Sequence, residues 1–229
     1  MFSQRAELQH DWEQGDYVEG GVLEDRIDWN RLAEMEEQTM RILRKTLDEH
    51  DKIVAHYSGG LDINVVVHLL SRLDHDTDVK LLNYRTIEQY PATVEFVQGM
   101  FDAYDFPHEE FVTEHRDMEW VKENPDVRLF PRWEKKDELY NESYRFAAHD
   151  YHQEHDVDAF ITGRRHEHCV TKTRICTDKE AYDMSPRYPD LEEMTCWQIN
   201  AIEPWGIEHV VAYLDKYNIP MMPSYHHYS

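Results

Sequence analysis

The segment His56-Tyr-Ser-Gly-Gly-Leu-Asp62 carries the residue types best suited to holding a phosphate. It directly follows a short apolar run and opens a helical stretch. Gly59 and Gly60 let backbone N–H groups approach a phosphate without a Cβ in the way, and a helix N-terminus adds positive potential. Ser58 can donate a hydroxyl hydrogen bond. We therefore predict a phosphate site at this glycine loop, residues 58–62. An ordinary strand-to-helix turn capped by Asp62 is the alternative interpretation.

A basic stretch in the second half of the chain could bind the same kind of anion. Its cations are Arg164, Arg165, Lys172 and Arg174. Guanidinium groups make bidentate contacts with phosphate or sulfate, so this stretch predicts an anion pocket. A solvated basic loop paired with surface acids is the competing interpretation. A weaker basic run contains Arg128, Arg132, Lys135 and Lys136, and it fits a lid over a nucleotide as well as a solvated surface.

The elements that must position these residues alternate along the chain. Apolar spacing predicts helices over 29–49, 62–73, 91–104, 137–154 and 206–217, and strands over 52–57, 79–84, 108–112, 158–162 and 198–202. Residues 113–136 show no clear period. Such alternation forms right-handed βαβ units with a parallel sheet. We predict an α/β fold, a Rossmann-like three-layer sandwich with a mostly parallel five-stranded sheet, over residues 29–229. Residues 1–28 are expected to form a polar N-terminal arm.

In a sheet of this kind, ligands bind beyond the carboxyl ends of the strands, where the strand order reverses. The loops that follow strands are therefore the places to search for a site, and they cover residues 58–62, 84–91 and 163–174. The predicted nucleotide- and phosphate-binding residues are Ser58, Gly59, Gly60, Leu61, Asp62, Thr86, Gly163, Arg164, Arg165, Lys172 and Arg174.

Five segments, in order along the chain, resemble the phosphoadenosine phosphosulfate (PAPS) reductase branch of the adenine nucleotide α-hydrolase superfamily. They are Ser58–Asp62, similar to the pyrophosphate loop, Tyr90–Phe96, Arg132-Trp133, Gly163–Cys169, similar to a Gly-x-Arg-Arg turn, and a closing stretch from Ile199 to Tyr225. The resemblance covers nearly the whole chain after the N-terminal arm.

The resemblance implies that the glycine loop holds the phosphates of ATP or a PAPS-like nucleotide, with Mg²⁺ as the partner of ATP. It implies that Arg165 contacts phosphate or sulfate and that Glu167 stands at the family's acidic position. With Asp62, which could hold a divalent cation or cap the helix, these are the predicted catalytic residues. The implied chemistry is adenylation of an acceptor with release of pyrophosphate, ahead of sulfur or nitrogen transfer.

The sequence departs from the family pattern in two places that matter for chemistry. Ile63 stands where the loop of ATP-cleaving members has a serine, and no cysteine follows Cys196, whereas the reductase branch attacks sulfur with a cysteine of the C-terminal tail. Two alternatives therefore stay open: a sulfonucleotide reductase that uses Cys169, and a member that binds a nucleotide or a protein partner without catalysis. No iron–sulfur cluster and no protein-bound metal centre are expected, because the cysteine and histidine spacings match no standard motif.

The charge of the chain limits its partners. Asp and Glu number 47 against 24 Lys and Arg, for a formal net charge of −23, and this repels nucleic-acid backbones and anionic membranes. A nucleic acid is expected only as a substrate delivered on a basic face or by a basic partner subunit. No apolar run approaches the roughly 20 residues that cross a bilayer. We expect a cytoplasmic protein that binds a small adenine nucleotide, alone, as a homo-oligomer or with a protein partner.

Overall fold

The computed structural model describes residues 27–74, 79–86, 89–125, 144, 146–166, 182–184 and 196–222. In chain order the elements are α3 (Trp29–Glu49), β1 (Ile53–His56), α4 (Leu61–Ser71), β2 (Val79–Arg85), α5 (Pro91–Ala103), β3 (His108–Val112), α6 (Glu114–Glu123), α8 (Ala147–Glu154), β4 (Ala159–Ile161), β5 (Tyr182–Met184), β6 (Trp197–Ile199) and α9 (Ile207–Tyr217). No helix in these ranges is long and apolar enough to cross a membrane. The predicted N-terminal arm lies outside them, except for its last two residues.

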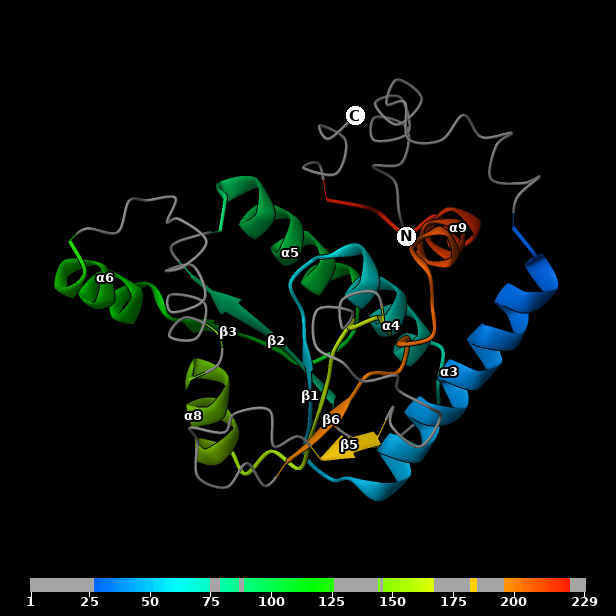
Figure 1. The fold of residues 1–229 in the computed structure, drawn as a ribbon, viewed down its shortest axis with the longest axis horizontal. Helices are drawn as coiled ribbons and strands as arrows, with labels where there is room; N and C mark the ends of the chain where they lie inside the picture. The colour runs from blue at the N-terminus through cyan, green and yellow to red at the C-terminus, as the bar shows by residue number, and fades with distance from the viewer. Residues whose placement is uncertain are drawn as a thin grey trace.

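The strands form one sheet in the order β3-β2-β1-β4-β6-β5 (Figure 1). The five strands from β3 to β6 pair in parallel, which confirms the predicted parallel sheet. The sixth strand, β5, pairs antiparallel with β6 at the edge and was not predicted. The strand order reverses at β1, which pairs with β2 on one side and with β4 on the other. This reversal places the expected ligand position at the carboxyl ends of β1 and β4.

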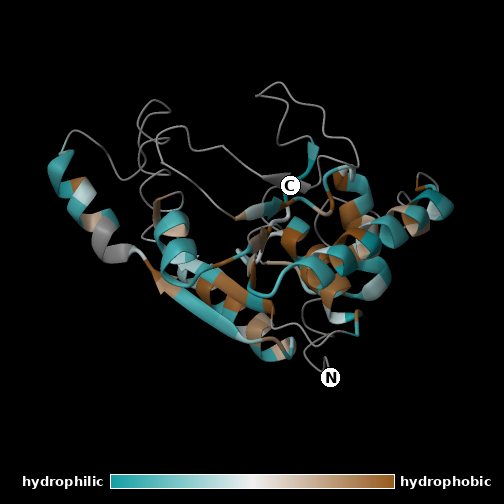
Figure 2. Cartoon of the chain, turned by 90° about the horizontal axis from the view of Figure 1, so that it is seen from below, coloured by the Kyte–Doolittle hydropathy of each residue, from teal (hydrophilic) through white to brown (hydrophobic). Residues whose placement is uncertain are grey.

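Successive side chains of the strands pack alternately into two apolar cores, one on each face of the sheet. Ile53 and Ala55 of β1 belong to the larger core, which α3, α4, α5 and α9 complete. Val54 between them belongs to the smaller core, which lies under α8. Figure 2 shows apolar colouring on much of the sheet and on parts of the helices that pack around it. Helices on both faces of a parallel sheet make the predicted three-layer sandwich.

The helix ends follow ordinary capping chemistry. The side chain of Asp28 accepts hydrogen bonds from the backbone N–H groups of Asn30 at 3.0 Å and Arg31 at 3.1 Å, and so fixes the start of α3. Pro91 occupies the first turn of α5, where its missing N–H costs nothing. α9 ends at Asn218, whose φ of 52° lies in the left-handed region that Asn tolerates.

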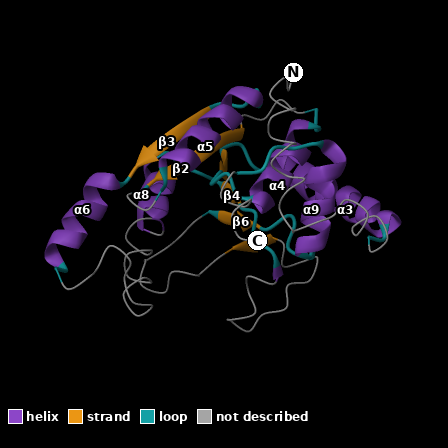
Figure 3. Cartoon of the chain, turned by 90° about the horizontal axis from the view of Figure 1, so that it is seen from above, coloured by secondary structure: helices purple, strands orange, loops and turns teal. Residues whose placement is uncertain are grey.

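Residues 113–136 show no clear period in the sequence, yet their first part forms α6. This helix leads away from the carboxyl end of β3, clear of the other helices (Figures 1 and 3). Its Met118 is exposed, so the helix lacks the buried apolar stripe that a sequence pattern detects. Residues 126–143 lie outside the described ranges, and so does the first part of the helix predicted over 137–154.

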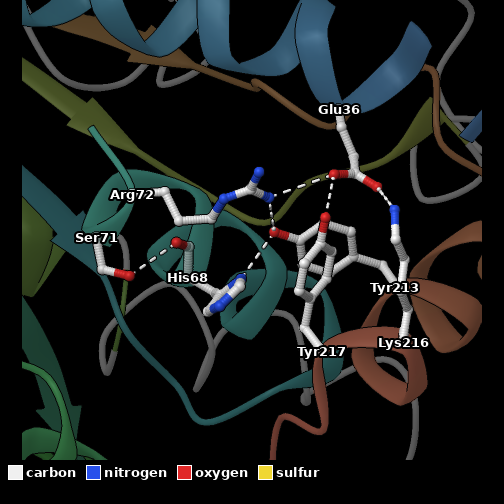
Figure 4. A network of polar contacts seen from close by, with 7 residues as sticks. All are labelled: Glu36, His68, Ser71, Arg72, Tyr213, Lys216 and Tyr217. Carbon is white, nitrogen blue, oxygen red and sulfur yellow. Dashed lines mark hydrogen bonds and ion pairs between the residues drawn. The ribbon is translucent and has the colours of Figure 1, made fainter. Parts of the chain in front are cut away.

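A polar network around Glu36 joins α3, α4 and α9, which lie side by side (Figures 3 and 4). The buried carboxylate accepts hydrogen bonds from Lys216 Nζ at 2.7 Å, the Tyr217 hydroxyl at 2.8 Å and the Arg72 guanidinium at 3.3 Å. The Tyr213 hydroxyl in turn accepts from Arg72 at 3.2 Å. A buried carboxylate is tolerated when it is paired and hydrogen-bonded in this way. The network therefore holds α9 against the helix that follows the glycine loop.

Candidate functional site

The glycine loop connects β1 to α4 at the strand reversal. Gly59 has a φ of +75°, in the left-handed region that favours glycine. A Cβ at this position would also lie 3.1 Å from Phe96 Cδ1 and 3.1 Å from Val97 Cγ2 of α5. Gly60 is the N-cap of α4, and Ser58 is exposed beside it. The turn therefore depends on Gly59, and it leaves the N-terminus of α4 without a side-chain cap at Gly60.

Buried polar side chains in the protein interior hold the glycine loop in place through hydrogen bonds. The Tyr57 hydroxyl donates to Asn64 Oδ1 at 2.6 Å, and Asn83 Nδ2 of β2 donates to the Tyr57 carbonyl at 2.8 Å. Asn64 Nδ2 donates to the carbonyl of Pro220, beyond α9, at 3.3 Å. Burial raises the pKa of the Tyr57 hydroxyl far above its usual range, so this group stays a donor. Sequence reasoning missed these anchors, although an asparagine inside the apolar run of α4 is a signal for Asn64.

Arg165 and Asp62 form an ion pair between the two predicted loops. Arg165 Nε donates to Asp62 Oδ1 at 2.6 Å, and the two side chains are only 6% and 21% exposed. Asp62 lies in the first turn of α4, and Arg165 follows the carboxyl end of β4. The pair brings together two residues 103 positions apart in the sequence, both of which were predicted as catalytic. Asp62 thus holds the buried guanidinium of Arg165 by its Nε atom, next to the glycine loop.

Gly163 explains how the two loops come so close. A Cβ on Gly163 would lie 2.5 Å from Ile63 N, 2.8 Å from Asp62 C and 2.9 Å from Ile63 Cα. These are backbone atoms of α4, which cannot rotate away as a side chain can. The β4 turn, residues 163–166, therefore packs directly on the first turn of α4. The side chain of Ile63 is 3% exposed and belongs to the larger apolar core.

The carboxyl ends of β4 and β6 carry a second set of polar contacts, which sequence reasoning also missed. Asn200 Oδ1 accepts hydrogen bonds from Thr162 Oγ1 and from Gln198 Nε2, each at 2.8 Å. The Arg164 N–H donates to Thr162 Oγ1 at 3.3 Å. These bonds tie the start of the β4 turn to β6. Asn200 belongs to the closing stretch, Ile199 to Tyr225, that carries the family resemblance, but its hydrogen bonds to Thr162 and Gln198 were not predicted.

Thr86, predicted from its place after β2, is buried at the carboxyl end of that strand, next to β1. Its carbonyl accepts the Gln89 N–H at 3.2 Å, and its hydroxyl lies 3.5 Å from that of Tyr144. Thr93, in the first turn of α5, donates its hydroxyl to Met222 Sδ at 3.2 Å. The segment after α9 thus reaches the start of α5, close to where Phe96 borders the glycine loop.

A chain of buried groups lies on the α8 side of the sheet. His56 Nε2 is 2.9 Å from His152 Nε2 and 3.1 Å from the Tyr84 hydroxyl, and His152 Nδ1 is 3.5 Å from Cys196 Sγ. Burial lowers the pKa of His152 to about 3 and that of His56 well below its usual value, with the neighbouring imidazoles adding to the effect. Burial raises the pKa of Cys196 to about 11. This cysteine, the one that falls in the described ranges, therefore stays a thiol and is a poor nucleophile.

Several predicted residues lie outside the described ranges: Glu167, Cys169, Lys172, Arg174 and the basic run from Arg128 to Lys136. Within those ranges, no group of three or more His, Cys, Asp or Glu side chains is arranged to hold a metal ion. Of the predicted site, the structure thus brings together the glycine loop, Asp62, Gly163, Arg164 and Arg165, with Thr86 two strands away from the β4 turn.

Comparison with known proteins agrees with this architecture. The family model of the phosphoadenosine phosphosulfate reductase domain matches residues 52–228, which begin one residue before β1. A search of curated proteins returned no match.

Solved structures share the fold at low sequence identity. The PAPS reductase of Candida auris, in a phosphate complex, is similar with a TM-score of 0.62 and 17% identity over 87% of this chain and 91% of that one. The NH3-dependent NAD synthetase of Campylobacter jejuni has a TM-score of 0.57 and 17% identity over 84% and 75% of the two chains. The FMN adenylyltransferase of Candida glabrata, in complex with FAD and inorganic pyrophosphate, has a TM-score of 0.58 and 13% identity, over 86% of this chain and 61% of that one.

Proposed function

Because the chain belongs to the phosphoadenosine phosphosulfate reductase domain family, we propose that it is an enzyme that binds an adenine nucleotide and acts at its α-phosphate. The phosphates lie on the glycine loop, and an acceptor is adenylated as pyrophosphate leaves. The observation that carries the proposal is the buried ion pair between Arg165 and Asp62 beside that loop. It supplies a fixed cation where the loop supplies backbone N–H donors.

The binding step depends on backbone geometry. The first N–H groups of α4 have no acceptor within the helix and carry partial positive charge, so they favour an anion. The left-handed Gly59 shapes the turn, and Gly60 opens α4 without a side chain over the helix end. This local positive potential offsets the net charge of −23 for a nucleotide that reaches the loop.

The chemical step places charge on the α-phosphate. The acceptor's nucleophilic atom forms a bond to that phosphorus, the bond to the bridging oxygen of the β-phosphate breaks, and pyrophosphate leaves with the electron pair. The acceptor loses its proton. Arg165 stabilises the charge that develops on the phosphoryl oxygens, and Asp62 holds the guanidinium so that it need not reorganise during the reaction.

Mg²⁺ is the expected partner of ATP in this site. A Mg²⁺ ion bound to nucleotide phosphates keeps several waters and takes one or two protein carboxylates. Asp62 is the carboxylate that the glycine loop provides, and its Oδ1 already holds Arg165. The residues present thus fit a metal carried in by the nucleotide, which would supply charge neutralisation at the phosphates.

A sulfonucleotide reductase is the second candidate, and the family description favours it. That reaction needs a reactive thiolate, and the buried Cys196 does not provide one, because its pKa is raised to about 11. Cys169 is then the candidate nucleophile. Release of sulfite from PAPS by the wild type, lost in Cys169→Ser and kept in Cys196→Ser, would favour the reductase over the adenylating enzyme.

Pyrophosphate release from ATP and Mg²⁺ tests the proposal, with water as the acceptor. Arg165→Gln is expected to lower the rate by about 100-fold, the usual scale for losing one fixed donor at a developing charge. Arg31→Gln is the matched control, because Arg31 pairs with Glu34 on an exposed face of α3 and should leave the rate unchanged. A folded wild type that binds ATP but releases no more pyrophosphate than Gly60→Asp would show a binding protein without catalysis and contradict the proposal.

A further inference from the structure

A buried carboxylate lies next to His166 of the β4 turn and has no part in the nucleotide site described so far. Glu203, which follows β6, is 2% exposed, and its Oε1 has no hydrogen-bond partner among the residues that the structure describes. The ion-pair partner that the described residues offer it is His166, whose Nδ1 lies 3.8 Å from Oε1. The His166 N–H also donates to the Glu203 carbonyl at 2.7 Å, which fixes the two residues relative to each other.

An unsatisfied buried carboxylate costs free energy, so its retention needs an explanation. The ring nitrogen of His166 that lies near this carboxylate is Nδ1, at 3.8 Å, just beyond hydrogen-bond distance. A carboxylate that accepts from Nδ1–H fixes the tautomer in which Nε2 carries a lone pair. The His166 side chain is 44% exposed whereas that of Glu203 is 3% exposed. The pair of His166 and Glu203, called the dyad below, therefore combines a buried carboxylate with an imidazole that is accessible to solutes.

The position of the dyad relates it to the phosphate chemistry. His166 directly follows Arg165 in the β4 turn, so their Cα atoms are about 3.8 Å apart. Arg165 contacts Asp62 at the glycine loop, and Gly163 holds the whole turn against α4. His166 and Glu203 lie on the β4–β6 side of the reversal, whereas Thr86 lies on the β2 side. The β4 turn thus carries both the guanidinium that pairs with Asp62 and the imidazole that lies next to Glu203.

We propose that His166 is the general base that activates the acceptor and that Glu203 positions its ring. The inference rests on the proposed function. The acceptor is a nucleophile with a removable proton, a hydroxyl, an amine or water. As its oxygen or nitrogen bonds to the α-phosphorus and pyrophosphate leaves, His166 Nε2 takes the proton, and the Glu203 carboxylate stabilises the resulting imidazolium. ATP and the acceptor thus yield an adenylated acceptor, pyrophosphate and one proton.

The kinetic test uses the full chain with ATP, Mg²⁺ and water as the acceptor. His166→Gln is expected to lower kcat for pyrophosphate release by about 100-fold or more while the Kd for ATP stays unchanged, because general-base catalysis contributes roughly 10²–10⁴-fold. Glu203→Gln should lower kcat in the same way, and Glu203→Asp should restore part of it. His108→Gln, on the exposed edge strand β3, is the matched control and should keep the wild-type rate. A wild-type kcat in His166→Gln overturns the proposal.

A second readout works without turnover and separates this proposal from the proposed function. Nitrogen-15 NMR of the histidine rings reports which nitrogen carries the proton. His166 is expected as the Nδ1–H tautomer in the wild type and as the ordinary Nε2–H tautomer in Glu203→Gln. The same tautomer in both proteins overturns the role of Glu203, whether or not ATP is cleaved. If the tautomer changes but the wild type releases no pyrophosphate, the dyad exists and it is the proposed reaction that fails.

Discussion

Replacing Gly163 with alanine tests how closely the β4 turn must approach α4. The new Cβ would lie 2.5 Å from Ile63 N, and an ordinary contact needs about 3.4 Å, so the two backbones must separate by roughly 0.9 Å. The same shift would stretch the 2.6 Å contact between Arg165 and Asp62 to the limit of a hydrogen bond. We expect a loss of about 1–3 kcal/mol in the free energy of unfolding, the usual cost of overpacking. Pyrophosphate release should fall by about 100-fold, since a displacement near 1 Å costs that much.

Urea unfolding and the pyrophosphate assay measure the two effects. Gly99→Ala is the matched control, because Gly99 lies within α5 and a Cβ there would meet nothing within 4 Å. In a helix interior this change should stabilise the protein by about 0.5–1 kcal/mol. If Gly163→Ala unfolds at the wild-type urea concentration and keeps the wild-type rate, the close approach of the two loops is not what holds the site together.

Three further changes test other parts of the structure. Gly59→Ala puts a non-glycine residue at a φ of +75° and should cost about 1–2 kcal/mol of unfolding free energy in urea; an unchanged midpoint would contradict the loop geometry. Glu36→Gln removes the charge that Lys216 contacts at 2.7 Å and should lower the free energy of unfolding by about 2 kcal/mol. This is less than the cost of breaking a fully buried ion pair, because Lys216 is about one-third exposed. A stability equal to that of the wild type would show that the network contributes little. His152 has a pKa of about 3 in the folded protein against about 6.5 when unfolded, so the unfolded chain alone takes up the proton and stability falls as the pH drops from 6.5 toward 3. His152→Gln should flatten the dependence of the urea midpoint on pH in that window, and an identical slope would refute the assignment.

The sheet could be predicted because its strands are buried on both faces. A parallel strand covered by helices on both sides reads as a continuous apolar run, as in β4 and in β1 up to His56. β2 is mostly apolar as well, with Lys80, Asn83 and Arg85 as its polar positions. Residues typical of a first helical turn, such as Pro91, then indicate where the helices begin. The helix α6 carries no comparable signal, because an exposed helix needs no apolar stripe, and the short edge strand β5 is too brief to show a period.

The glycine loop and Arg165 could be predicted because glycines and an arginine directly after predicted strands are typical of phosphate-binding loops. The contact between Arg165 and Asp62 follows from topology, since β1 and β4 are neighbours at the reversal of the sheet. Burial of a polar side chain is a different matter, because it depends on the whole packing. Nothing in the sequence distinguishes Glu203, which is buried, from the exposed Glu34. The burial of Asn83 and Asn200 could not be predicted for the same reason.

Isothermal titration of the folded protein with ATP and Mg²⁺, and separately with PAPS, tests the central claim most directly. We expect saturable binding of at least one of these nucleotides to the wild type. Gly60→Asp, which places a carboxylate at the N-terminus of α4, should weaken the same binding by at least about tenfold. Arg31→Gln should bind as the wild type does. No binding of either nucleotide, or binding that Gly60→Asp leaves unchanged, would contradict a nucleotide site at the glycine loop.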